Sequence, residues 1–173
     1  SMSSIEVVKF KAAINSVQEG LGIWPRFSGI MQDLILDKEA KTAKESQEFV
    51  EELNQALEEL GMVESVEIYN TPTGLKIIIA DPLLFDSGDA LLKSKFKKLL
   101  ISIGELLKKM HYTNIRIEGH TDNMPINTLK YPSNWELSAA RALAATKFLA
   151  FEGGMPPEKL SAVGYGEYRP RDS

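Results

Sequence analysis

The chain has 173 residues, of which 43% are hydrophobic and 25% are charged, and its formal net charge is −4. This length allows one compact domain with a substantial core and some additional elements, and the composition is that of an ordinary globular protein. The acidic balance argues against nucleic-acid binding, because phosphate recognition usually requires an excess of Lys and Arg. The absence of cysteine excludes a disulfide scaffold and a thiolate metal site.

The first 62 residues are expected to be mainly helical. Two helices are predicted there, of which the second spans about residues 38–60 with Gly61 as its C-cap. A short strand is possible within residues 23–38. Residues 4–62 are therefore interpreted as an N-terminal helical linker or periplasmic extension, whose first helix docks on a partner or a helix pair, or packs on its own domain. The first helix is predicted from apolar residues spaced by three and four positions: Val7, Phe10, Ile14, Val17 and Leu21.

Residues 63–173 are predicted to form the main domain, which opens with a hairpin. Residues 66–69 alternate between apolar and polar, residues 70–74 have turn chemistry, and residues 75–80 are almost all apolar. A continuous apolar run indicates a strand that is covered on both faces. No apolar run in the chain reaches the roughly 20 residues that span a bilayer, and no signal peptide is visible.

Two more helices and two short strands are predicted in the second half. The first helix spans about residues 90–110, with Ser87 or Asp89 as its cap, and a strand follows at 114–118. After a loop over residues 119–132, Ser133 and Glu136 match the capping box of a helix that runs to about residue 151. A last strand is expected at 161–164. The succession β-β-α-β-α-β predicts an α/β domain, a β-α-β-α-β layer with helices packed on a mixed sheet.

A carboxylate and a guanidinium stand out by their positions. Asp122 follows a predicted strand, where ligands commonly bind in open α/β sheets. Asn134, Ser138 and Arg141 are spaced by four and three residues, so they share one face of the fourth helix. Asp122 and Arg141 would suit a zwitterionic ligand, because Arg grips a carboxylate and Asp accepts from an ammonium group. The alternative is that they pair with each other and tie the loop to the helix.

The segment 118–170 resembles the OmpA-like peptidoglycan-binding domain. The resemblance is carried by Thr121-Asp122 together with the stretch LSAARA at 137–142, and by the final motif AVGYGEYRP. The sequence segments TDNMPI and SNWELSAARA are most similar to those of the flagellar stator B subunits (MotB) within that family. The broader resemblance covers about residues 75–171, and it extends more loosely to the preceding helices as a linker from a membrane helix.

The resemblance implies a non-catalytic binding function. The family binds the diaminopimelate-containing stem peptide of peptidoglycan, and its Asp and Arg hold the zwitterionic end of diaminopimelate. On this chain those two roles fall on Asp122 and Arg141, while Thr121, Asn123, Leu137 and Ser138 would shape the pocket. A stator B subunit anchors the motor to the cell wall as a homodimer. The resemblance therefore also implies a periplasmic domain, an inner-membrane anchor, a stator A subunit (MotA type) as partner, and no cofactor.

The two ends of the chain differ from the complete family pattern. Ser1-Met2-Ser3 resembles an expression scar in front of a fragment, so a native membrane anchor would lie outside these residues. OmpA-like domains continue beyond the GYGEYRP segment with a further helix and a closing strand, whereas this sequence ends at Ser173. We therefore expect some ligand-facing residues to be absent and one sheet edge to be uncovered.

Other functions fit the residues less well. Ser138, His120 and Asp122 are the types found in a hydrolase, but there is no GxSxG elbow. His120 and Asp122 give only two metal ligands where about four are usual, so we expect no metal site. An interaction module, or the anchoring tail of another outer-membrane protein or lipoprotein, remains an alternative. Trp135 and Tyr131 could stack on sugar, although packing is the expected role of Trp135.

Overall fold

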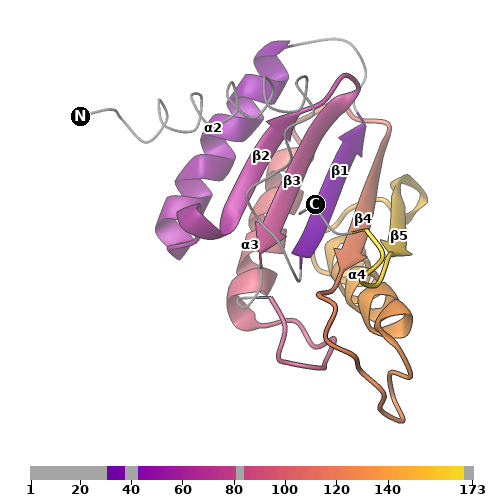
Figure 1. Cartoon of the computed structure of the whole chain (residues 1–173). Coiled ribbons are helices and arrows are strands. Elements are labelled where there is room, and N and C mark those ends of the chain that lie inside the picture. Colours follow the sequence, from indigo (N-terminus) through magenta and orange to yellow (C-terminus); the bar gives the residue numbers. More distant parts are fainter. Residues whose placement is uncertain (1–30, 38–42, 81–83, 170–173) are drawn as a thin grey trace.

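The computed structural model describes residues 31–37, 43–80 and 84–169 (Figure 1). The helix predicted from Val7 to Leu21 lies outside these residues. No helix among the described residues is long and apolar enough to cross a membrane.

The described residues form a five-stranded mixed sheet in the order β2-β3-β1-β4-β5. Strand β1 runs antiparallel to both of its neighbours, β3 and β4, while β4 and β5 are parallel. The β2–β3 pair is the predicted hairpin, and residues of β3 are buried on both faces, as expected for an apolar strand. The bounds of the strands are β1 Met31–Asp37, β2 Val66–Asn70, β3 Gly74–Ala80, β4 Asn114–His120 and β5 Leu160–Gly164.

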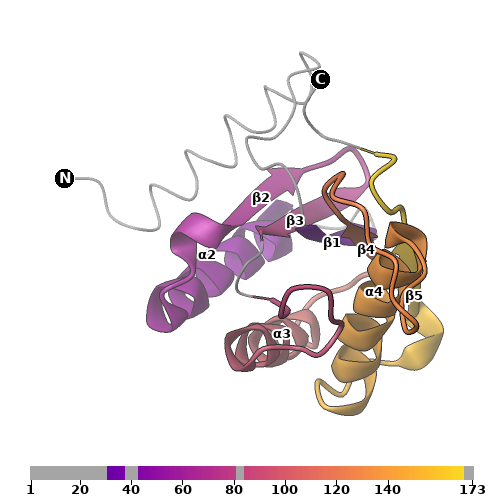
Figure 2. The same ribbon diagram turned by 60° about the horizontal axis from the view of Figure 1, so that its bottom comes forward.

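In the described part of the chain, three α-helices cover one face of this sheet (Figure 2). They are α2 Ala43–Leu60, α3 Ser94–Leu107 and α4 Asn134–Phe151. Alternate residues of the strands, such as Leu34 and Ile117, meet the apolar stripes of the helices in a single core cluster. Burial of this apolar surface supplies most of the driving force for folding. The mixed α/β architecture predicted from the sequence is confirmed.

The N-terminal part of the described chain belongs to the same core. The possible strand within residues 23–38 is confirmed as β1, which occupies the middle of the sheet. Helix α2 contributes Phe49, Leu53 and Leu57 to the shared core. The domain boundary placed between residues 62 and 63 stays a prediction, but residues on both sides of it build one sheet.

Helix α3 is shorter than expected, and its predicted caps were wrong. It begins at Ser94 after Lys93, which makes no side-chain cap, and neither Ser87 nor Asp89 caps it. Residues 84–93 instead form a loop closed by a bridge between Phe85 and Leu92. The Asp89 carboxylate accepts a hydrogen bond from the Ala90 backbone N–H within that loop, at 2.7 Å.

Helix α4 lies unusually close to β4 and β5 because two glycines face it. A Cβ added to Gly119 would lie 2.3 Å from the Ser138 carbonyl oxygen. A Cβ added to Gly164 would lie 2.4 Å from the Ala139 backbone nitrogen. The small residues of α4 and these glycines therefore allow the helix backbone to touch the sheet, which fixes the side chains of α4 relative to the strand ends.

Candidate functional site

Three loops meet where β4 ends and α4 begins: residues 121–133, 84–93 and 165–169. The Thr121 N–H donates to the Gly166 carbonyl at 2.9 Å, and the Gly166 N–H donates to the Ser138 hydroxyl at 2.9 Å. Gly166 has a φ of 60°, a conformation that favours glycine. The Lys130 ammonium lies 3.3 Å from the Asp89 carboxylate and links the loop 121–133 to the loop 84–93. These contacts fix the frame of the candidate site.

Asp122 sits in this frame as a half-exposed carboxylate. Its Oδ1 accepts from the Met124 N–H at 3.1 Å, which forms a local turn at the start of the loop. The Asn134 side-chain amide donates to the Met124 carbonyl at 3.0 Å and to the Asp122 carbonyl at 3.4 Å. The described residues offer no hydrogen bond to Asp122 Oδ2. The Met124 backbone thus holds one oxygen of this partly exposed carboxylate, and the other oxygen makes no hydrogen bond to the described residues.

Arg141 is only 1% exposed. Its Nε donates to the Asp89 carbonyl at 2.7 Å, and a second guanidinium nitrogen donates to the Asp86 carbonyl at 3.0 Å. The guanidinium also lies over the Phe85 ring, 4.9 Å from its centroid. Arg141 therefore fastens the 84–93 loop to α4. The hydrogen-bond partners described for Arg141 are different from those described for Asp122.

The other four predicted site residues divide into a buried set and an exposed one. Leu137, Ser138 and Thr121 are buried, and Asn123 is exposed. Ser138 accepts from Gly166 and donates to the Trp135 carbonyl at 3.1 Å, so its hydroxyl is structural. The Thr121 hydroxyl is buried and makes no hydrogen bond among the described residues. A buried hydroxyl without a partner is uncommon, and it is available to a bound ligand or water.

The residues of this site lie in the part of the chain that matches known proteins. The OmpA family model matches residues 84–173. The chain is 33% identical over 172 residues to the uncharacterized protein YtxE of Bacillus subtilis, covering 98% of this chain and 71% of that protein. Together these matches decide the family. The chain belongs to the OmpA family.

Two further relatives are described by function. Motility protein B of Bacillus subtilis is 41% identical over 105 residues, which are 61% of this chain and 40% of that protein. A solved structure, the cell wall anchor of the T6SS from Pseudomonas aeruginosa, matches with a TM-score of 0.59 and 30% identity. That match covers 70% of this chain and 83% of the anchor. The chain thus spans less than half of the motility protein but most of the anchor domain.

Several residues of this OmpA-family site were not predicted from the sequence. Asp89 ties the site together through its carbonyl, which binds Arg141, and its carboxylate, which binds Lys130. The Ala90 N–H, followed by Lys130, lowers the pKa of the Asp89 carboxyl below its usual value. Gly166 was the one position with a visible signal, since a glycine inside a polar turn suggests a positive φ.

An exposed aromatic pair borders the site. Trp135, 48% exposed, stacks on Tyr168, 62% exposed, with ring centroids 5.0 Å apart. Packing was the expected role of Trp135, and its ring packs on Tyr168 at the surface, because the first turn of α4 turns this residue outward. Tyr131 is buried instead.

The arrangement of His120, Asp122 and Ser138 does not form a hydrolytic triad. The side chains of His120 and Glu118 lie on the face of β4 that is turned away from α4. Ser138 belongs to α4 itself. His120 stacks on Tyr165, with ring centroids 5.2 Å apart. The His120 and Asp122 pair considered as metal ligands is likewise not brought together, since His120 faces Asp33.

Proposed function

We propose that this domain binds the diaminopimelate-containing stem peptide of peptidoglycan without cleaving it. The main supporting observation is the half-exposed Asp122 carboxylate, of which one oxygen is fixed by the Met124 N–H and the other makes no hydrogen bond to the described residues. The relative described as a cell wall anchor, which this chain matches at 30% identity, supports a cell-wall ligand.

The ligand's chemistry suits the charges at the site. The end of the diaminopimelate side chain carries both an ammonium and a carboxylate group. Asp122 accepts from the ammonium group, and Arg141 supplies the positive charge for the carboxylate. Thr121 contributes its free hydroxyl, while Asn123, Leu137 and Ser138 form the surrounding wall. A charge-assisted hydrogen bond contributes about 1.5–3 kcal/mol, so its loss weakens binding by about 10- to 150-fold.

The test is co-sedimentation of the chain with isolated diaminopimelate-type peptidoglycan. Asp122→Asn removes the charge and keeps the shape, and we expect binding to fall by about tenfold or more. Glu105→Gln is the matched control, because it removes one exposed charge on α3, away from the site. Free diaminopimelate should compete, whereas lysine, which lacks the second carboxylate, should not. Equal pelleting of the Asn variant and the parent would overturn the assignment of Asp122.

We further propose that the binding anchors a flagellar motor stator to the cell wall. Support comes from the 41% identity to motility protein B. On this proposal the chain is the periplasmic part of an inner-membrane protein, which forms a homodimer and assembles with a stator A subunit (MotA type). Replacing the corresponding region of a motility protein B with this chain should restore swimming in soft agar, and Asp122→Asn should abolish it. A chimera that binds peptidoglycan but does not swim would refute the stator role alone.

A further inference from the structure

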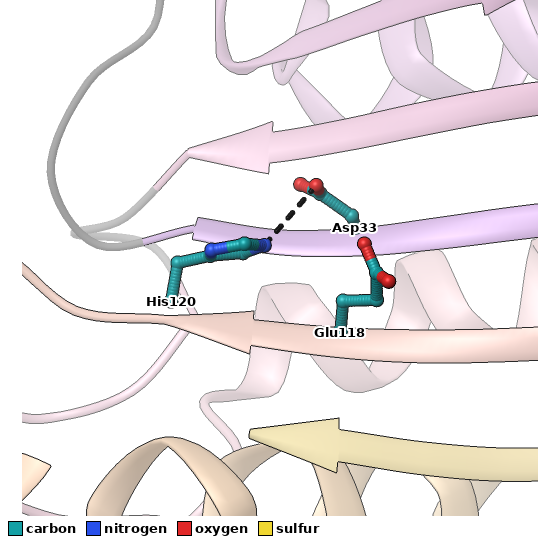
Figure 3. A group of neighbouring side chains, drawn as sticks. All are labelled: Asp33, Glu118 and His120. Atoms are coloured by element: carbon teal, nitrogen blue, oxygen red, sulfur yellow. Dashed lines mark ion pairs between the residues drawn. The ribbon is translucent and has the colours of Figure 1, made fainter. Parts of the chain in front are cut away.

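Three ionisable side chains lie together on the sheet face opposite the helices (Figure 3). Asp33 on β1 is directly opposite Glu118 on β4, and His120 is two residues further along β4. Their neighbours Leu34 and Ile117 point into the core, so the alternation of the strands places these three on the other face. They are 0%, 8% and 5% exposed, respectively.

The cluster is compact, and its histidine makes no hydrogen bond to the residues that the structure describes. One nitrogen or oxygen atom from each residue lies within 4.8 Å of the other two. His120 Nε2 is 3.4 Å from Asp33 Oδ2, an ion-pair distance (Figure 3). Within the described part of the chain neither ring nitrogen of His120 makes a hydrogen bond. Buried polar atoms are nearly always hydrogen-bonded, so these two ring nitrogens are candidate ligand atoms.

The residue types and the orientation of the cluster suit a metal cation. Imidazole nitrogen and carboxylate oxygen are both common metal ligands, and the three side chains are brought together by two neighbouring strands. Two side chains outside the cluster orient Glu118, because its Oε2 accepts hydrogen bonds from Arg116 Nε and from the Tyr165 hydroxyl, each at 2.9 Å. Its other oxygen is left for the cluster. Outer partners of this kind are usual for metal-binding carboxylates.

We propose that Asp33, Glu118 and His120 bind one Zn²⁺ ion that clamps β1 to β4. An imidazole combined with carboxylates is a zinc ligand set, whereas Ca²⁺ and Mg²⁺ prefer oxygen ligands alone. Zinc bonds of about 2.0–2.2 Å place tetrahedral ligand atoms roughly 3.4 Å apart. Small side-chain rotations therefore close the present cluster around the ion, and a water completes the fourth position. The site does not depend on the proposed peptidoglycan site.

The test is titration of the metal-free full chain with Zn²⁺ by isothermal calorimetry, with thermal unfolding measured in parallel. We expect one ion per chain and a rise in the unfolding temperature, because the ion binds only the folded arrangement. His120→Gln and Asp33→Asn should each weaken binding by about tenfold or more, consistent with the loss of a ligand. His111→Gln is the matched control, since His111 is an exposed histidine paired with Glu45 at 2.8 Å.

Each outcome decides the proposal. Absence of zinc binding by the parent chain overturns it, as does binding that persists in His120→Gln or disappears in His111→Gln. If His120→Gln does not fold, as judged by circular dichroism, the decision passes to Glu118→Gln, which keeps the hydrogen-bonding shape of the side chain. Peptidoglycan co-sedimentation of the same variants separates this result from the proposed function.

Discussion

Replacement of Arg141 by Lys tests whether this buried guanidinium holds the 84–93 loop. The substitution keeps the positive charge but removes the planar fork that reaches two carbonyls, those of Asp86 and Asp89. If the two hydrogen bonds position the loop, the variant should be less stable and the loop should open more often.

The expected magnitude follows from those two bonds. A hydrogen bond from a charged donor contributes about 1.5–3 kcal/mol. A lysine ammonium retains at most one of the bonds and leaves the other carbonyl without its present donor. We therefore expect Arg141→Lys to lower the free energy of unfolding by about 2 kcal/mol, a sizeable part of the stability of a domain this size.

Urea unfolding followed by circular dichroism measures the change. Lys147→Ala is the control, because Lys147 is exposed on the same helix and should change the free energy of unfolding by less than about 0.5 kcal/mol. Hydrogen exchange should also show faster exchange of the amides of residues 84–93 in Arg141→Lys. A loss below about 1 kcal/mol, with unchanged exchange, would refute the structural role argued from these bonds.

Four further results are expected. Gly164→Ala should destabilise the fold by about 2 kcal/mol in urea, since its Cβ would overlap the Ala139 backbone; an effect under 0.5 kcal/mol would contradict the close packing of α4. Ser133→Ala should cost about 1 kcal/mol through loss of the cap on Trp135 N–H. The Ser133 hydroxyl lowers the pKa of Glu136, so the stabilisation is present above the unfolded pKa and is lost as pH falls through the folded pKa. Glu136→Gln should remove this loss of stability at low pH. If the stability of the variant depends on pH as that of the parent does, the role of the Glu136 carboxylate is contradicted. Tyr168→Ala should change Trp135 fluorescence, because the two rings stack; an emission spectrum identical to that of the parent would mean that they do not stack in solution.

Local signals allowed the later helices and the hairpin to be predicted from the sequence. The start of α4 was found because Ser133 and Glu136 lie three residues apart, and the structure places the Ser133 hydroxyl against the Trp135 N–H and the Glu136 carboxylate. The 3.6-residue period similarly identified α2 and α3. These features depend on neighbours within one turn, which the sequence displays directly.

Long-range partners could not be predicted in the same way. Strand β1 was only a possibility, because its pairing with β3 and β4 depends on residues more than 35 positions away. The polar character of Arg141 was visible, but the carbonyls of Asp86 and Asp89 that it binds are 55 and 52 residues distant. Asp33 and His120 meet only after the sheet has formed. An ionisable residue can be recognised from the sequence, whereas its partner is determined by the topology.

The central position of β1 also determines how the domain would respond to a pulling force. All seven residues of β1 pair with β3 on one side and with β4 on the other. A force applied at Met31 along the strand would load both ladders in shear, so that many backbone hydrogen bonds must break together. A strand at the edge of the sheet that was peeled away from its neighbour would lose its bonds one at a time. A chain attached at this end is therefore held by the mechanically strongest part of the sheet.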